Sequence, residues 1–179
     1  LALIVMICAY SMAMIALLSM TPLFLQTVHG LTSTVTGVAF SLMLLFGALL
    51  QPSIGKLSDR IGRRPVFVAG NLIAACAASA IALAGGPVTT IAAMVVTATA
   101  LVGIRSVVLA SAVDHSGKRE ATTLGFTFAV MDGVGALGAV SAGVLGNFDL
   151  RYAFILAACL CSFAVAMAFV ASHLNAREE

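Results

Sequence analysis

Apolar residues run through this chain in long uninterrupted stretches that are separated by short polar breaks. Residues 1–54 contain no Lys, Arg, Asp or Glu, and the same is true of residues 65–104. A helix needs roughly 20 apolar residues to cross a hydrocarbon core about 30 Å thick, so each stretch is long enough for two spans. The backbone must form its own hydrogen bonds in lipid, and the spans are therefore predicted to be helices.

Five polar breaks divide the chain into six predicted membrane-spanning helices. The breaks lie near residues 27–34, 56–64, 85–90, 114–120 and 147–151. The helices are expected at approximately 2–26, 35–55, 65–84, 89–113, 121–146 and 152–173. The predicted fold class is therefore an all-α integral membrane protein.

The composition supports a membrane protein and argues against other classes. Charged residues make up 9% of the chain and apolar residues 61%, whereas soluble domains average about 25% charged residues. The apolar character continues into the last predicted helix, so a cleaved signal peptide does not account for it. The sequence contains no nucleophile–base pair, metal-ligand cluster or P-loop, and no charged domain suited to nucleic acid. We therefore expect neither an enzyme nor a cofactor, a metal or a nucleic-acid partner.

The positive charges are distributed unequally between the two sides of the predicted bundle. The second and fourth breaks and the C-terminal tail together carry seven Lys and Arg residues, whereas the other breaks carry only Arg151. Connections rich in Lys and Arg stay on the cytoplasmic side. Both ends of this segment are therefore predicted to face the cytoplasm, and the protein is expected in the plasma or bacterial inner membrane.

An internal repeat becomes visible when the chain is shifted by 88 residues. Residues 37–63 then match residues 125–151 without a gap, with identical residues at 10 of 27 positions. We place the two copies at residues 1–86 and 87–179, with three helices in each. Because three is an odd number, the copies must cross the membrane in opposite directions. Inverted repeats of this kind are typical of secondary transporters, whose substrate sites lie near the midplane where the repeats meet.

One short segment collects five of the 16 charged side chains. Residues 55–65 read GKLSDRIGRRP, which resembles the G-x-x-x-D-R-x-G-R-R signature of the major facilitator superfamily. That signature lies between the second and third helices of a six-helix half. The six-helix topology and the 3+3 inverted repeat extend the resemblance over the whole chain. It implies a fold of two such halves, and the stretch TPLFLQ at residues 21–26, the Leu1 start and the polar tail resemble the C-terminal half.

The resemblance also implies a role for the charged segment as a latch that stabilises one access state and opens in the other. The implied latch residues are Gly55, Asp59, Arg60, Gly62, Arg63 and Arg64. Gly55 and Gly62 permit a tight turn and a close helix approach, and Asp59 can pair with an arginine or a helix N-terminus. The alternative is a topology anchor at the anionic inner leaflet with no switching role.

Two charged residues fall inside predicted spans. Arg105 lies nine residues before Asp114, and Asp132 lies twelve residues after Glu120. At a rise of 1.5 Å per residue they lie about 13 Å and about 18 Å from the polar boundary. A charge near the bilayer centre costs at least about 2.5 kcal/mol, which makes this pair a candidate for proton coupling or substrate binding. A buried ion pair that fixes the register of two helices is the alternative.

Other polar residues are weaker candidates for a cavity lining. They are Tyr10, Gln26, Gln51 and Asn71. Each of them could equally form an interhelical hydrogen bond. Residues 133–138 spell G-x-G-x-x-G, but the dinucleotide fingerprint requires a βαβ unit around it. Inside a predicted membrane helix, these small residues indicate close helix packing instead.

These features predict a secondary active transporter that moves a small organic molecule by alternating access. We favour proton coupling and drug-type efflux, with the substrate, the lipid bilayer and the other six-helix half of the same protein as partners. The alternatives are an uncoupled facilitator, a nutrient uptake symporter and a non-transporting membrane scaffold or subunit. The family's antiporter signature has a Gly-Pro pair where this chain has Gly138-Ala139, so the sequence does not assign a direction.

Overall fold

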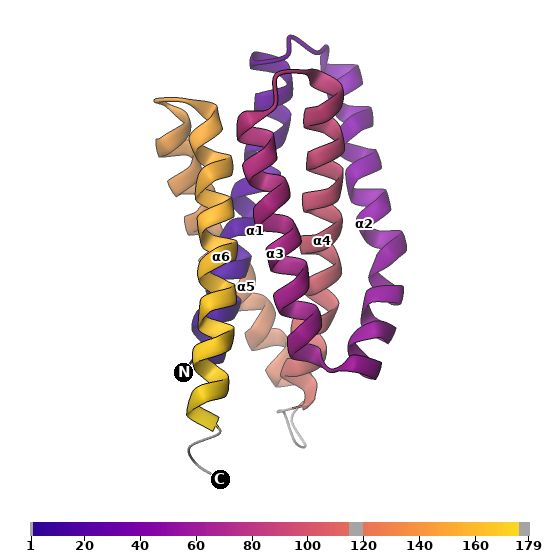
Figure 1. The fold of residues 1–179 in the computed structure, drawn as a ribbon, viewed down its shortest axis with the longest axis vertical. Coiled ribbons are helices and arrows are strands. Elements are labelled where there is room, and N and C mark those ends of the chain that lie inside the picture. Colours follow the sequence, from indigo (N-terminus) through magenta and orange to yellow (C-terminus); the bar gives the residue numbers. More distant parts are fainter. Residues whose placement is uncertain (1, 115–119, 176–179) are drawn as a thin grey trace.

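Six long helices make up the part of the chain that the computed structural model describes, residues 2–114 and 120–175 (Figure 1). They are α1 (Ala2–Thr27), α2 (Ser33–Ile61), α3 (Arg63–Leu83), α4 (Pro87–Asp114), α5 (Glu120–Gly146) and α6 (Leu150–Asn175). Each of the six is long and apolar enough to cross a membrane. The described residues contain no β-strand. The prediction of an all-α membrane fold is confirmed.

The charged segment is mostly helical, where the sequence predicts a loop between helices at 35–55 and 65–84. α2 continues to Ile61 and α3 begins at Arg63, so Gly62 alone separates them. Gly62 has a φ of 99°, in the left-handed region that favours glycine. Its N–H donates to the carbonyl of Ser58 at 3.0 Å. One glycine is therefore enough to end one helix and begin the next, and the other helix boundaries lie within two residues of those predicted.

Consecutive helices run in opposite directions, and the triplet α1–α3 is inverted relative to the triplet α4–α6. In Figure 1, α1 rises from the end of the bundle that holds the N-terminus, whereas α4 descends toward that end. The first helix of each triplet packs mainly against the other triplet: α1 against α5 and α6, and α4 against α2 and α3. α3 and α6 also pack together. In both triplets, therefore, the first helix packs against the second and third helices of the other triplet, and the six helices form one bundle.

The core of the bundle lies among α1, α3, α4 and α6. Its largest fully buried side chains include Tyr10, Phe24, Leu101, Ile104 and Phe154. The rings of Phe24 in α1 and Phe154 in α6 meet edge-on, with their centroids 4.9 Å apart. Only 22% of the most apolar stretch of α2 and of α5 is buried, against 44–50% in the other four helices. α2 and α5 therefore present wide faces to lipid or to further protein.

Glycines at equivalent positions of the two triplets allow close crossings between them. Gly47 of α2 packs against Val102 of α4, and an added Cβ atom would lie 3.0 Å from the Cβ of that valine. Gly135 is the equivalent of Gly47 in the repeat, and it packs against Ile15 of α1. In lipid, small residues let two helix backbones approach closely. The crossing of α2 with α4 and the crossing of α5 with α1 therefore both use a glycine at the equivalent position.

Replacing Gly138 by alanine is expected to destabilise the bundle. A Cβ atom at this position of α5 would collide with the backbone carbonyl of Met12 in α1, and a backbone cannot rotate away as a side chain can. Overpacking substitutions cost about 1–3 kcal/mol, so Gly138→Ala should lower the melting temperature of the full-length protein in detergent. Gly133→Ala in the same helix is the matched control, because nothing lies within 4 Å of its added Cβ atom. Equal melting temperatures for the two variants would contradict this packing.

Candidate functional site

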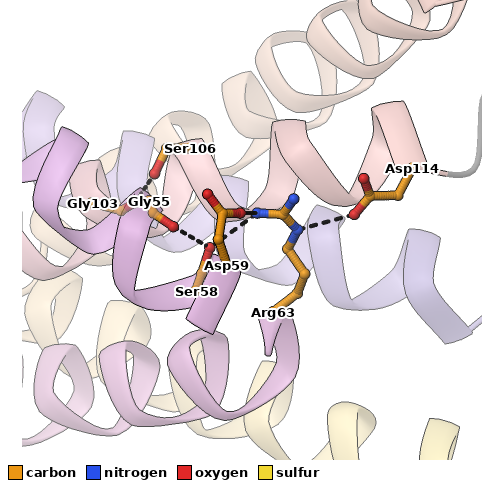
Figure 2. A network of polar contacts seen from close by, with 7 residues as sticks. All are labelled: Gly55, Ser58, Asp59, Arg63, Gly103, Ser106 and Asp114. Atoms are coloured by element: carbon orange, nitrogen blue, oxygen red, sulfur yellow. Dashed lines mark hydrogen bonds and ion pairs between the residues drawn. The ribbon is translucent and has the colours of Figure 1, made fainter. Parts of the chain in front are cut away.

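A polar network joins the ends of α2, α3 and α4 at one end of the bundle (Figure 2). Arg63 lies at its centre. Its Nη1 donates to Oδ1 of Asp59 at 2.5 Å, and its Nε donates to Oδ2 of Asp114 at 3.0 Å. Nη1 also donates to Oγ of Ser58 at 3.1 Å, and Ser58 donates to the carbonyl of Gly55 at 2.8 Å. One guanidinium at the start of α3 thus connects the ends of two other helices.

The helix dipoles explain why a cation is needed at this position. Asp59 lies in the last turn of α2 and Asp114 is the last residue of α4, so both carboxylates lie at the negative ends of helix dipoles. Arg63 places a positive charge between them, and its planar fork of donors can serve both carboxylates at once. The three side chains are between 30% and 60% exposed. Because exposed ion pairs add little net stability, the network mainly orients the helix ends.

The remaining implied latch residues lie around this network. Gly62 supplies the break between α2 and α3, and Gly55 faces α4 within the last turns of α2. The guanidinium of Arg64 lies 5.5 Å from the centroid of the Phe169 ring in α6. Arg60 is exposed. The charged segment at the α2–α3 junction therefore contacts two helices of the other triplet, α4 and α6.

Two members of the network have no assigned role in the sequence prediction. Asp114 serves there only as a helix boundary, although a carboxylate at the end of an otherwise apolar span is a signal for a nearby cation. Ser58 is 1% exposed and lies between the exposed Leu57 and Asp59. Its burial depends on how α2 packs, and no pattern in the sequence reports that.

The two intramembrane charges form an ion pair between α4 and α5. Nη2 of Arg105 lies 3.6 Å from Oδ1 of Asp132. The Arg105 guanidinium also lies 5.4 Å from the centroid of the Phe128 ring in α5, which is a cation–π geometry. The side chain of Asp132 is 62% exposed, whereas that of Arg105 is 28% exposed. The carboxylate therefore faces outward from the six-helix bundle.

The four candidates for a cavity lining lie in different environments. Tyr10 is fully buried, and its hydroxyl donates to the carbonyl of Leu101 in α4 at 2.6 Å. Asn71 is also fully buried and donates to a carbonyl one turn earlier in its own helix at 2.9 Å. Gln51 is half-buried in α2, and Gln26 is exposed near the end of α1. The bond of Tyr10 thus joins two helices, as in the hydrogen-bonding alternative, whereas the bond of Asn71 stays within α3.

The positive charges behind the predicted orientation are only partly described. Those at the α2–α3 junction lie at the network end of the bundle, and Arg151 lies at the opposite end, where α6 begins (Figure 1). Lys118, Arg119 and Arg177 lie outside the described residues.

Comparison with known proteins assigns the chain to a family. The sequence profile of the Major Facilitator Superfamily matches residues 2–179. The chain belongs to the Major Facilitator Superfamily. The lactose permease of Klebsiella pneumoniae is 40% identical over 55 residues, which are 31% of this chain and 42% of the permease. The chain thus matches less than half of that relative, and the resemblance carried by residues 55–65 to the superfamily is confirmed.

Loss of the Arg63 guanidinium is expected to loosen the ends of α2 and α4 in this superfamily member. Arg63→Gln leaves Asp59 and Asp114 at negative helix ends without their cation. Backbone amides in the last turns of both helices should then exchange hydrogen about two to five times faster, as measured by mass spectrometry on the full-length protein. Arg60→Gln is the control, because that exposed side chain lies outside the network. The network has no orienting role if both variants exchange alike.

Proposed function

We propose that this chain is part of a secondary transporter that moves a small organic molecule across a membrane by alternating access. Membership in the Major Facilitator Superfamily and the six helices able to span a membrane support this proposal. The similarity to a lactose permease supports a small organic substrate. In this proposal the chain is one six-helix half, and the rest of the same protein supplies the other half.

The ion pair between Arg105 and Asp132 is the observation that carries the proposal. Asp132 lies near the middle of α5, and its side chain is 62% exposed. In lipid, a carboxylate at this depth would be costly. The cost falls if this face of α5 borders a polar path or contacts a second half. We therefore place the second half over this face, with the substrate path between the two halves.

The chemistry of this pair supports proton coupling. An ionised Asp132 attracts Arg105, whereas a protonated Asp132 carries no charge and releases it. Their separation of 3.6 Å is longer than an ordinary N–H···O hydrogen bond. The contact can therefore be exchanged for a proton, a water molecule or a charged group of the substrate. Access to Asp132 from opposite sides in alternate states would link proton movement to transport.

The direction of transport is a separate part of the proposal. We favour efflux of a drug-like compound from the cell. Uptake of a nutrient is the second candidate. Both directions use the same ion pair, so they are distinguished by which side of the membrane the substrate must be added to.

We also propose that the network around Arg63 is the latch, at the cytoplasmic end of the bundle. Its carboxylates come from α2 and α4, which belong to different triplets. A movement that separates the ends of these helices must break one of the two ion pairs. The contribution of such exposed pairs is small, so they can form and break within a transport cycle. The cytoplasmic placement rests on the excess of Lys and Arg at this end.

Replacing Asp132 by asparagine tests the coupling role. The full-length protein is reconstituted in proteoliposomes with an imposed pH gradient, and radiolabelled lactose and the lipophilic cation ethidium serve as probes. Asp132→Asn is expected to lose most gradient-driven transport, because an amide cannot bind the proton, and to retain exchange of the probe without net proton movement. Asp149→Asn at the end of the bundle where α6 begins is the matched control. Equal gradient-driven transport in both variants would remove Asp132 from the mechanism.

The latch is tested by the access state of the same full-length protein. Arg63→Gln is expected to shift the population toward the state in which the ends of α2 and α4 separate, because it removes both ion pairs. Distances between spin labels placed at the exposed Leu57 of α2 and at the partly exposed Ala110 near the end of α4 report this shift. An unchanged distance distribution would favour the topology anchor over the latch.

A further inference from the structure

We infer that Tyr10 is a positioning residue for Arg105 and that it acts from α1 through the backbone of α4. The inference rests on the proposed function of the Arg105–Asp132 pair, because it explains how the guanidinium is held at its carboxylate. Tyr10 belongs to neither of the helices that carry the charges.

The hydroxyl of Tyr10 is directed at one backbone atom. Tyr10 is fully buried, and its hydroxyl donates to the carbonyl oxygen of Leu101 at 2.6 Å. The sulfur of Met14, at 3.3 Å, is the weaker acceptor nearby. In an α-helix a carbonyl accepts a hydrogen bond from the N–H four residues later, which for Leu101 is the N–H of Arg105. The carbonyl of Leu101 therefore accepts two hydrogen bonds, one from the hydroxyl of Tyr10 and one from the backbone N–H of Arg105.

This bond joins two groups of helices. α1 packs mainly with α5 and α6, and α4 packs mainly with α2 and α3. α3 and α6 pack together across the two groups, whereas the contacts that α4 itself makes with α1 and α5 are minor. Asp132 belongs to the first group and Arg105 to the second. Tyr10 thus ties the group that carries the carboxylate to the helical turn that carries the guanidinium.

The position of the tyrosine ring is itself fixed. The ring of Phe67 in α3 meets it edge-on, with centroids 6.1 Å apart. Tyr10, Phe67 and Leu101 are all 2% exposed or less. With its ring held between α1, α3 and α4, the hydroxyl has little freedom to leave the Leu101 carbonyl.

The internal repeat argues against a general packing role for this tyrosine. The position equivalent to Tyr10 is Ala98, and the position equivalent to Arg105 is Leu17. The equivalent pair, Ala98 in α4 and Leu17 in α1, therefore has neither the tyrosine nor the arginine, although both copies pack their first helix in the same way. This packing thus does not by itself require a tyrosine.

Removal of the hydroxyl alone should leave the fold intact. In Tyr10→Phe the Leu101 carbonyl keeps its intrahelical bond from Arg105, so no buried polar atom loses its last partner. The aromatic ring, which supplies the packing, is retained. The expected consequence is a looser Arg105 and a less firmly paired Asp132.

The test is the reaction of Asp132 with dicyclohexylcarbodiimide, which modifies protonated carboxyl groups within membranes. Labelling of the full-length protein is followed at one pH by peptide mass spectrometry, and it requires no substrate. Tyr10→Phe should speed the labelling about threefold to tenfold, the factor expected for one hydrogen bond. Tyr152→Phe is the matched control, because it is the other tyrosine of the chain and is exposed on α6.

A double-variant comparison separates positioning from general stability. Arg105→Gln should also speed the labelling, and Tyr10→Phe should add nothing to it, because the tyrosine acts only through the arginine. Phe67→Leu, which removes the ring beside Tyr10, is a second variant expected to change the labelling in the same direction. If Tyr10→Phe fails to accumulate, Phe67→Leu takes its place in the comparison.

Three results would overturn the inference. The first is labelling of Tyr10→Phe, or of Phe67→Leu in its place, at the rate of Tyr152→Phe. The second is an equal acceleration by Tyr10→Phe in the Arg105→Gln background. The third is no acceleration by Arg105→Gln. If instead the labelling follows the expected pattern while Asp132→Asn transports normally, the positioning role stands and the proposed coupling role fails.

Discussion

In lipid an apolar side chain gains little by exchanging acyl chains for a neighbouring helix, so helices associate where their backbones can approach closely. In this bundle the close approaches occur between the triplets, at Gly47 against α4 and at Gly135 against α1. This packing between triplets places α4 beside α2, α3 and the middle of α5. Both polar sites depend on this placement, because α4 supplies Asp114 to one and Arg105 to the other.

The two polar sites therefore share one helix. Arg105 and Asp114 lie nine residues apart on α4, a distance of about 13 Å along the helix axis. In the proposed cycle, a movement of α4 that breaks the contact with Arg63 also moves Arg105 relative to Asp132. The hydrogen bond from Tyr10 to Leu101 lies one turn before Arg105 and limits that movement from α1. The proposed latch and the proposed proton site would then need no further relay between them, because α4 carries a residue of each.

The fold could be predicted from the sequence because lipid leaves few choices for uncharged stretches of this length. The exception is the charged segment, where Lys56 and Asp59 suggest a loop but a single glycine, Gly62, provides the whole break. The proximity of Arg105 and Asp132 could be anticipated from their depths on consecutive helices. The contacts of Arg63 with Asp114 and of Tyr10 with Leu101 could not. The first depends on how the α2–α3 junction packs against α4, and the second uses a backbone acceptor that no sequence pattern reports.

The inverted arrangement of the triplets is the central claim, and labelling of two equivalent positions tests it most directly. Arg60 and Phe148 are equivalent in the repeat, and both are exposed at the ends of the bundle. Each is replaced by cysteine in the full-length protein after removal of its native cysteines, and intact cells are treated with a membrane-impermeant maleimide. The account predicts that the cysteine at 148 reacts in intact cells and the cysteine at 60 reacts only after permeabilisation. Reaction of both from the same side would contradict it.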